Sequence, residues 1–471
     1  MIFGQNNIVK QQMTASTNMS IKNSFVVIFA MNLVLLSFCS IAQTKSTTDS
    51  VQPLNLDQCI VYALKNQPNV LRSDLDIAIA KKNNEIKLSA WLPQANLNAN
   101  YVHYNQLPTT LITNSANPNG PLLKQNTGIA NTFIPQLTIT ETIFSPDVAY
   151  AASSARLLVQ QAQLSNDSTK INLVANVSKS FYNVLFTLEQ ITILKEDTLR
   201  LARNVGDAYH QYIGGIVDKT DYKEAFISLN NSKAALRQAK ENVVPQYATL
   251  KQLIGFPPEK NFSISFDTLQ MIRDIAFDTT QVLKFENRIE FKQIETAKAL
   301  QKKNVEYNKS KFLPTLSAFY NYNYEYENPS SSRLFSQAYP YSYCGATLSL
   351  PLFTGMQRLG NIQKAKLQQQ QLNLSETGLQ LSIYSQYTAA LAQYKSNLYN
   401  LNILNDNVAM AKEVYNVVTL QYKQGVIPYL NVITAESNVM SSEINYYNAL
   451  FQVLSSKVDL EKAMGNTLTK K

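Results

Sequence analysis

The chain has 471 residues, of which only 13 are glycine, and a formal net charge of +9. A glycine content well under the roughly 7% average favours long helices over many short elements, and the length suits two or three domains. The basic residues cluster only in pairs such as Lys81-Lys82 and Lys302-Lys303, without interleaved aromatic residues, which indicates a solvated surface and argues against nucleic acid as a partner.

Residues 1–42 have the pattern of a secretory signal peptide. Lys22 precedes an apolar run over residues 25–38. Ser40-Ile41-Ala42 then supplies the small side chains that signal peptidase requires for cleavage before Gln43. The sequence therefore predicts an exported protein.

Three other interpretations of residues 1–42 concern the start of translation, lipid attachment and membrane anchoring. Met19 is a second candidate for the start of translation, which would place residues 1–18 outside the protein. Lipid attachment at Cys39 is disfavoured, because Phe38 stands where a lipobox has Gly, Ala or Ser. A retained anchor is also disfavoured, because the apolar run is shorter than the roughly 20 residues of a spanning helix.

Beyond the leader only two cysteines remain, Cys59 and Cys344. Two distant cysteines make no disulfide framework, and we expect both to pack as small apolar side chains. No later segment has 18 consecutive apolar residues, so any membrane crossing by the mature chain has to use strands.

The first of two similar units is predicted to span residues 43–255. It opens with a helix over Leu56–Ala90, which Pro93 ends. Two strand-like runs follow, at about 95–105 and 133–144, separated by a polar loop that contains Pro and Gly.

A very long helix is predicted next. Between Pro146 and Gly206 there is no Gly or Pro for 59 residues, which would make a helix about 88 Å long at 1.5 Å per residue. A second helix returns to Gly255. Asn and Gln fill many positions that a dry coiled-coil seam gives to Leu, so these helices are expected to face water along much of their length. Residues 256–282 link the units, and the alternation over Phe262–Asp267 could add one short strand.

Residues 283–471 repeat this order. A helix over Leu283–Lys311, strands at about 315–327 and 339–352, and a long helical hairpin ending at Gly465 are predicted. Matching landmarks lie roughly 210 residues apart, which is too long a period for a solenoid and indicates a duplicated unit. The pairs are Ser89–Pro93 with Ser310–Pro314, Ile143–Pro146 with Leu352–Gly355, Tyr212–Val217 with Tyr422–Ile427, and Leu250–Gly255 with Leu460–Gly465.

The strands alternate in polarity along their length. In Ala318–Tyr326, AFYNYNYEY, tyrosine takes every second position from Tyr320 to Tyr326. About ten residues of alternating polarity are typical of a transmembrane barrel strand, and tyrosine suits the membrane interface. We expect Tyr320, Tyr322, Tyr324 and Tyr326 to face lipid or its interface, and Asn321, Asn323 and Glu325 to face a water-filled lumen.

Four strands cannot close a barrel alone, and open strand edges are not tolerated in lipid. Several copies must therefore contribute: two copies would give eight strands and three would give twelve, of which only the larger leaves room for a channel. The predicted fold is mainly α with a transmembrane β-barrel, built from long antiparallel helices and four strands per copy.

These motifs, in this order and duplicated, resemble the TolC-like family of outer membrane efflux proteins. The resemblance covers nearly the whole mature chain. Leu54–Pro68 is similar to the family's opening helix and Asn287–Lys292 to the start of its second repeat. Pro351–Gly355 and the two Tyr-x-x-Gly hairpin tips also fit the family pattern.

The resemblance implies a homotrimer whose twelve-stranded barrel crosses the outer membrane of a Gram-negative bacterium, in contact with its lipid. A twelve-helix α-barrel would extend into the periplasm. Drugs, metals or other small molecules expelled by an inner-membrane pump would pass through it, with a periplasmic membrane-fusion adaptor protein between pump and duct. A pump of the resistance-nodulation-division type is favoured over an ABC type. Type I protein secretion is one alternative, and a periplasmic helical scaffold or binding protein is another, of a different class.

The resemblance also assigns roles to the hairpin tips. The adaptor contacts would be Tyr212, Gly215, Ile216 and Val217 in the first unit and Tyr422, Gly425, Val426 and Ile427 in the second. Well-studied members carry acidic residues six and nine positions after the second glycine, where this chain has Asn431 and Thr434. Asp221 and Glu224 occupy the matching offsets in the first unit. We therefore expect an aperture that binds multivalent cations less well than an acidic ring does.

The sequence carries no enzyme motif. It contains no HExxH, Cys/His cluster, P-loop or Gly-x-Ser-x-Gly, and no cofactor, metal site or catalytic residue is predicted. His103 lies on a predicted strand beside Tyr101 and Tyr104, which favours a structural role for it.

Overall fold

The computed structural model describes residues 53–113, 120–266 and 268–466. The predicted signal peptide, with Met19 and Cys39, lies outside these residues. All helices and strands described below belong to the unit Pro53–Lys471.

The predicted opening helix is two helices. α2 spans Leu56–Asn66 and α3 spans Pro68–Leu88, with Gln67 between them in an extended conformation (φ −70°, ψ 123°). The prediction of one continuous helix over Leu56–Ala90 is therefore wrong. The ring of Pro68 disfavours helical angles at the residue before it, so one helix stops there and the next begins with proline in its first turn.

Four strands form one antiparallel sheet in the order β1-β4-β5-β6. They are β1 (Gln94–His103), β4 (Asn131–Phe144), β5 (Thr315–Asn328) and β6 (Ala338–Ser349). Each overlaps one of the four predicted segments. The β4–β5 ladder joins the two repeats, so this four-stranded sheet is shared between them. β1 and β6 are the edge strands, and within the described residues neither has a partner on its outer side.

The loop between β1 and β4 contains a second, two-stranded sheet. β2 (Thr109–Ile112) pairs antiparallel with β3 (Leu123–Asn126). The predicted polar loop is therefore partly ordered, because the β-branched residues of β2 favour an extended ladder. The corresponding loop between β5 and β6 holds only the 3-10 turn η3 (Ser331–Ser336).

Each repeat contributes one long helical hairpin. In the first, α4 (Pro146–Ile213, 68 residues) is followed by α5 (Lys219–Ile254, 36 residues). In the second, α8 (Gln357–Lys423, 67 residues) is followed by α9 (Tyr429–Met464, 36 residues). α4 runs on through Gly206, because a glycine costs a helix interior only about 1 kcal/mol and packing along the helix outweighs it. Across the described ranges, none of the helices combines the length and apolarity that a membrane span requires.

Shorter elements lead into the strands. α7 (Ile289–Ser310) precedes β5 in the second repeat, as α3 and the 3-10 turn η1 (Ser89–Trp91) precede β1 in the first. α7 follows the 3-10 turn η2 (Phe285–Asn287), so the helix begins later than the predicted Leu283.

The segment between the repeats is largely irregular. It contains one short helix, α6 (Thr268–Asp274), which the sequence did not predict. The strand suggested for Phe262–Asp267 is reduced, over its described residues, to a single bridge in which Ile264 pairs with Leu54.

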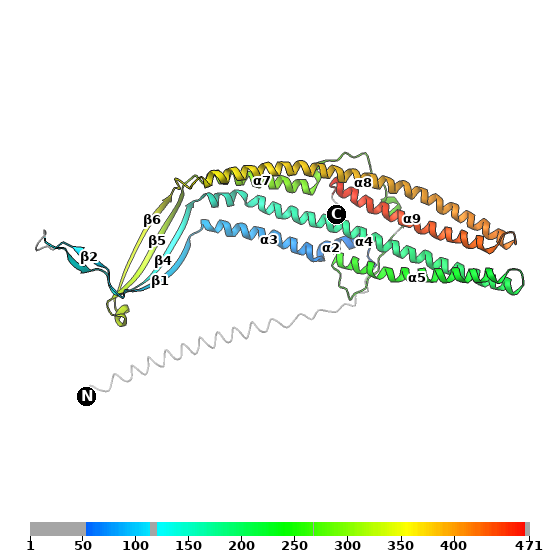
Figure 1. The fold of residues 1–471 in the computed structure, drawn as a ribbon, viewed down its shortest axis with the longest axis horizontal. Coiled ribbons are helices and arrows are strands. Elements are labelled where there is room, and N and C mark those ends of the chain that lie inside the picture. The colour runs from blue at the N-terminus through cyan, green and yellow to red at the C-terminus, as the bar shows by residue number, and fades with distance from the viewer. Residues whose placement is uncertain (1–52, 114–119, 267, 467–471) are drawn as a thin grey trace, which may run out of the picture. The chain divides into compact units, whose positions relative to one another are not determined.

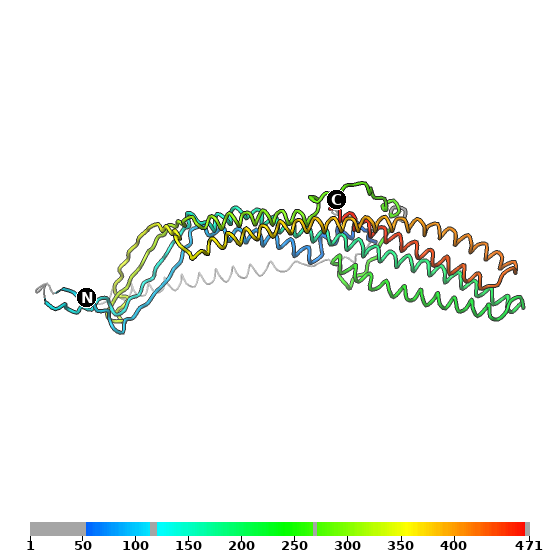
Figure 2. The backbone as a smooth tube through the Cα atoms, turned by 45° about the horizontal axis from the view of Figure 1, so that its top comes forward, coloured from blue at the N-terminus to red at the C-terminus, as the bar shows by residue number. Residues whose placement is uncertain are grey.

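The helices lie side by side in one layer (Figures 1 and 2). Near the sheet the contacts give the lateral order α8-α7-α4-α3, and towards the hairpin tips they give α8-α9-α4-α5. α4 in the middle buries 21 of its 68 residues, whereas α8 buries only 4 of 67. The layer therefore has two open edges, with α8 on one side and α3 and α5 on the other.

Both repeats end on a glycine that packs against the end of a short helical element, α2 in the first repeat and η2 in the second. Gly255 (φ 70°) caps α5 and Gly465 (φ 73°) caps α9, both in the left-handed conformation. A Cβ on Gly255 would lie 2.8 Å from the carbonyl oxygen of Asn66, and one on Gly465 would lie 2.7 Å from the carbonyl carbon of Asn287. Only glycine suits both the backbone angle and the close approach.

Candidate functional site

The first hairpin tip is a tight turn between α4 and α5. The Gly215 N–H donates to the carbonyl of Tyr212 (3.0 Å), and the Ile216 N–H donates to the carbonyl of Gln211 (2.9 Å). These bonds close the last helical turn around Gly215, whose φ of 69° is left-handed. Ile216 is left 75% exposed at the end of the hairpin, and Val217 is half-buried behind it.

The second tip repeats this geometry between α8 and α9. The Gly425 N–H donates to the carbonyl of Tyr422 (2.9 Å), and the Val426 N–H donates to the carbonyl of Gln421 (3.0 Å). Gly425 has a φ of 70°, Val426 is 70% exposed and Ile427 is half-buried. Each tip thus presents one exposed aliphatic side chain on the same type of turn.

Aromatic contacts brace each tip, and a hydrogen bond joins the two tips. Tyr212 stacks on Tyr222 with ring centroids 6.4 Å apart, and Tyr422 packs against Tyr429 at 5.1 Å. The Tyr422 hydroxyl donates to Oε1 of Gln211 on the other hairpin (2.6 Å). A small buried cluster behind these rings consists of Ala208, Ala225, Tyr429 and Val432.

The four predicted aperture residues lie on two helices. Asp221 and Glu224 are half-buried on α5, whereas Asn431 and Thr434 are exposed on α9. Burial raises the pKa of the Tyr422 phenol, and the nearby charge of Asp221 adds to this effect. At these positions the first hairpin therefore carries the acidic side chains, and the second presents neutral ones.

A buried charged network, which the sequence analysis missed, ties the two hairpins together. Glu436 on α9 is 2% exposed and accepts hydrogen bonds from Nε of Arg200 (3.3 Å) and Nδ2 of Asn204 (3.0 Å), both on α4. Arg200 also donates to Oδ1 of Asp197 (3.3 Å), and Oγ of Ser232 on α5 donates to the other oxygen of Asp197 (2.7 Å). One network thus connects α4, α5 and α9.

The two carboxyls of this network are poised against ionisation. Burial, and next the charge of Asp197, raises the pKa of the Glu436 carboxyl to about 7 despite the opposing effect of Arg200. Burial also raises the pKa of Asp197. A single guanidinium serves two buried carboxyls, so ionising both leaves one negative charge without a partner of opposite sign.

The strand register divides the sheet into an apolar face and a polar face. The apolar face consists of Leu97 and Tyr101 of β1, Phe133, Leu137 and Ile139 of β4, and Tyr320, Tyr322, Tyr324 and Tyr326 of β5. The polar face consists of Asn96, Asn98 and Asn100 of β1, Gln136, Thr138 and Thr140 of β4, and Asn321, Asn323 and Glu325 of β5. The polarity that alternates along β5 is therefore shared by β4 and β1.

β6 departs from this division. Its tyrosines Tyr339, Tyr341 and Tyr343 pair with Glu325, Asn323 and Asn321, so they lie on the polar face. The residues between them, Pro340, Ser342 and Cys344, lie with the tyrosines of β5 on the apolar face.

His103 belongs to a hydrogen-bond cluster around Asn131 at one end of the sheet. Its Nδ1 lies 2.7 Å from Oδ1 of Asn131, which also accepts a hydrogen bond from the Tyr101 hydroxyl (2.9 Å). The amide nitrogen of Asn131 donates to the carbonyls of Asn328 and Pro329. His103 thus belongs to a contact that joins β1 and β4 to the end of β5.

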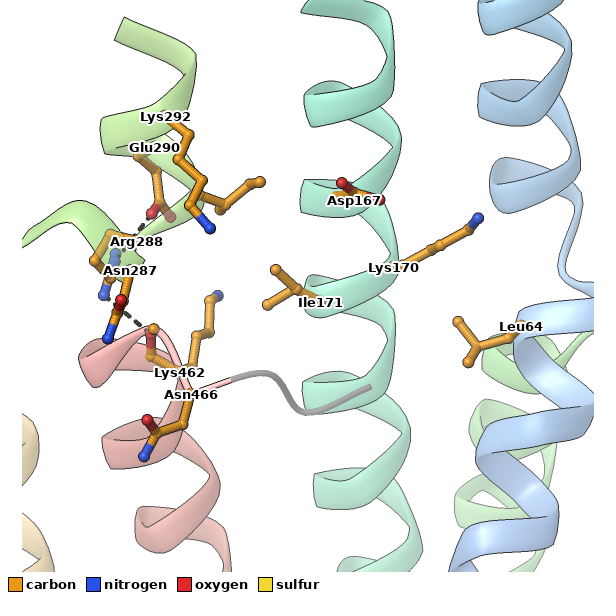
Figure 3. A pocket seen from close by; sticks show the side chains of 12 residues that line it. Leu64, Asp167, Lys170, Ile171, Asn287, Arg288, Glu290, Lys292, Lys462 and Asn466 are labelled. Carbon is orange, nitrogen blue, oxygen red and sulfur yellow. Dashed lines mark hydrogen bonds and ion pairs between the residues drawn. The ribbon is translucent and has the colours of Figure 1, made fainter. Parts of the chain in front are cut away.

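A cavity of about 380 Å³ lies between α4, α7 and α9 (Figure 3). The guanidinium of Arg288 in its wall donates to the carbonyls of Lys462 and Ala463 and to Oε2 of Glu290. These bonds close the C-terminal end of α9, which gives Arg288 a structural role. Within the described ranges there is no group of three or more His, Cys, Asp or Glu side chains arranged to hold a metal ion.

The profile of one protein family, described as outer membrane efflux protein, matches residues 59–256 and 284–466. The chain belongs to this family. The gap between the two matched segments falls in the irregular region around α6. As a member of this family, the chain is a protein of the Gram-negative outer membrane, and the TolC-like resemblance noted in the sequence is confirmed.

Individual relatives of this outer membrane efflux protein are distant. The probable efflux pump outer membrane protein TtgC of Pseudomonas putida is 22% identical over 308 residues, which cover 63% of this chain and 61% of TtgC, less than two thirds of its length. The outer membrane protein TolC of Escherichia coli is 18% identical over 428 residues, 88% of this chain and 83% of TolC. The structure of the MtrE outer membrane channel of Neisseria gonorrhoeae superposes with a TM-score of 0.68 at 18% identity, over 90% of this chain and 95% of MtrE. At such identity this likeness establishes the fold, and it confirms the predicted class of long antiparallel helices with a few antiparallel strands.

Proposed function

We propose that this outer membrane efflux protein is the exit duct of a tripartite efflux system and passively conducts small molecules across the outer membrane. The observation that carries this proposal is the pair of open edges that the sheet and the helix layer share. β1 and β6 end the sheet, and α3 and α8 end the helix layer beside it. Because α3 leads into β1 and β6 leads into α8, the edges of sheet and layer fall on the same two sides of the chain.

The helix edges carry apolar side chains at heptad-like spacing. On α8 the exposed residues are Leu359, Leu367, Leu374 and Leu381, and on α3 they are Leu71, Leu75, Ile79 and Ile86. Such stripes are typical of helices that pack against further helices, and large exposed apolar patches mark interfaces. The two stripes belong to different surfaces, so copies of the chain would join head to tail and close into a ring.

A ring of three copies suits the geometry best. Three four-stranded sheets give a twelve-stranded barrel without edges, which satisfies the backbone hydrogen bonds that lipid leaves unmet. In that barrel the apolar face, with Tyr320, Tyr322, Tyr324 and Tyr326, contacts lipid or its interface, and the polar face lines the lumen. Twelve strands also leave a lumen wide enough for solutes, which eight do not.

The hairpin tips are the proposed docking end. Exposed aliphatic side chains on two similar tight turns, Ile216 and Val426, offer matching contacts to a periplasmic membrane-fusion adaptor protein. An inner-membrane pump would deliver the substrate there, and we favour the resistance-nodulation-division type over the ABC type. The aperture would be formed by Asp221, Glu224, Asn431 and Thr434. Membership in an efflux family supports a duct over the periplasmic scaffold alternative.

The proposal is tested by the mass of the protein–detergent complex and by conductance in planar lipid bilayers. The wild-type protein should have the mass of three chains and should conduct potassium chloride. Leu374→Glu places a charge in the α8 stripe and should yield smaller species that do not conduct. Asn373→Glu is the matched control, because Asn373 is also exposed but points about 100° away around the helix. A monomeric wild-type protein, or a Leu374→Glu variant that assembles and conducts normally, would refute the ring.

A further inference from the structure

The polar face of the sheet carries an aromatic ladder, Tyr339, Tyr341 and Tyr343, along β6. Each of these side chains is about half exposed, on a face that is made mostly of amides, hydroxyls and carboxylates. The rings of Tyr341 and Tyr343 are stacked, with centroids 6.5 Å apart and planes inclined by 10°. Apolar burial does not account for these rings, since they stand away from the apolar face.

Gly345 leaves room for a fourth ring, that of Phe319, at one end of the ladder. Phe319 of β5 is paired with Gly345 of β6. A Cβ on Gly345 would lie 2.7 Å from the Phe319 ring, so the ring lies across the space that the missing side chain leaves. Phe319 also meets Tyr343 edge to face, with centroids 6.1 Å apart. The rings of Phe319, Tyr343 and Tyr341 therefore form one continuous aromatic surface, and Tyr339 follows on the same face.

The other end of the ladder is acidic. Glu325 pairs with Tyr339 across the strands, and Glu327 follows two residues later on the same face. The four strands β1, β4, β5 and β6 contain no lysine or arginine, so nothing cationic on them neutralises these carboxylates. Beside the ladder, Asn323 is 2% exposed and its Nδ2 makes no hydrogen bond, which leaves a donor for an acceptor atom of a bound molecule.

We propose that the aromatic ladder, together with Glu325 and Glu327, is a binding site for planar aromatic cations that pass through the lumen. This inference rests on the proposed function, because it requires the polar face to line a channel. Tyrosine rings attract cations through their π faces and stack on flat ring systems, and adjacent carboxylates favour positive over negative molecules of the same shape. In a ring of three copies, three such sites would surround the lumen.

Propidium, a planar aromatic dication, is a suitable probe, and pyranine, a planar aromatic polyanion, is its counterpart. The fluorescence of propidium is titrated with the purified, detergent-solubilised full chain, and pyranine is titrated in parallel. Propidium should bind saturably and pyranine at least tenfold more weakly. Equal affinity for the two dyes, or no binding of propidium, overturns the proposal.

Variants locate the site on the ladder. Tyr341→Leu with Tyr343→Leu should weaken propidium binding at least tenfold, whereas phenylalanine at both positions keeps the rings and should retain affinity within about twofold. Tyr320→Leu with Tyr322→Leu, on the apolar face, is the matched control and should leave affinity unchanged. If the leucine variants on both faces behave alike, the dye binds elsewhere and the proposal fails.

Conductance separates this inference from the proposed function. The titration needs no open channel, so binding is measured whether or not the protein conducts. A wild-type protein that conducts potassium chloride but does not bind propidium refutes the ladder site and leaves the duct standing. A protein that does both should show a propidium-dependent fall in current, and the Tyr341→Leu, Tyr343→Leu variant should require at least tenfold more dye for the same fall.

Discussion

Replacing Glu436 by glutamine tests whether the buried network between the hairpins depends on pH. The substitution keeps the size of the side chain and an acceptor oxygen, but removes the carboxyl whose pKa is raised to about 7. Glu436 sits between Arg200 and Asn204 on α4, so the change acts where α9 is joined to α4. At pH 5 the folded wild-type chain holds a neutral carboxyl there, and the variant should then be about equally stable.

The sign of the pH dependence follows from the raised pKa. Between the ordinary value of 4.5 and about 7 the folded chain binds more protons at Glu436 than the unfolded chain does, so the free energy of unfolding falls as the pH rises. Above pH 7 the loss is complete. Its upper bound is about 3.5 kcal/mol, at about 1.4 kcal/mol for each pH unit between the two values. Glu436→Gln should lack this loss and should be the more stable form at pH 8.

Hydrogen exchange measured by mass spectrometry gives a local readout, because peptides over residues 197–204 and 432–439 report the opening of this network. After correction for the intrinsic effect of pH, wild-type protection in these peptides should fall by up to about a hundredfold between pH 5 and pH 8. Protection in Glu436→Gln should stay nearly level.

Asp459→Asn is the matched control for this experiment. Asp459 lies on the same helix and also pairs with a cation of α4, Lys179 (2.5 Å), but it is 23 residues from Glu436, about 35 Å along the helix. This control should follow the wild-type profile. The reasoning fails if Glu436→Gln keeps the wild-type pH dependence, or if wild-type protection rises with pH.

Three further outcomes are expected. Gly425→Ala should lower the free energy of unfolding by roughly 1–2 kcal/mol, because alanine disfavours the left-handed backbone angle at this position. Gly465→Ala should lower it further, because the added Cβ would also lie 2.7 Å from the backbone of Asn287, and thermal unfolding of the two variants compares these losses. Burial raises the pKa of the Cys59 thiol to about 12, so Cys59 should resist maleimide at pH 8 until the protein is denatured, and labelling of the native protein at this position would contradict the structure. Asn431→Asp with Thr434→Asp should strengthen block of single-channel current by trivalent cations, and unchanged block would remove these positions from the aperture.

Periodicity predicted the elements that depend on local sequence. The four strands were found because polarity alternates within each of them, and both hairpins were found from long stretches without proline. The break at Gln67 could also be read from the sequence, since Pro68 restricts the backbone of the residue before it. The passage of α4 through Gly206 was not readable, because it depends on packing against neighbouring helices.

Features that depend on pairing between distant segments escaped prediction. Alternation along β6 shows that Tyr341 and Ser342 face opposite ways, but only the register with β5 decides which of them shares a face with Asn323. The network around Glu436 joins residues more than two hundred positions apart along the chain. The sequence around Glu436 does indicate that this residue is buried, because it falls on the same apolar helix face as Val432 and Val439. A buried carboxyl requires a hydrogen-bonding or charged partner, although the sequence does not identify it.

For the proposed barrel, the edges of β1 and β6, which have no partner within the described residues, also set an order of events in biogenesis. A single chain would carry two rows of free backbone N–H and C=O groups into hydrocarbon, at a cost of several kcal/mol for each group. Insertion therefore has to wait until copies have met, and the yield of inserted protein depends on how often chains encounter one another in the periplasm. Slow synthesis would leave solitary chains with exposed strands, open to proteolysis before the lipid can stabilise them.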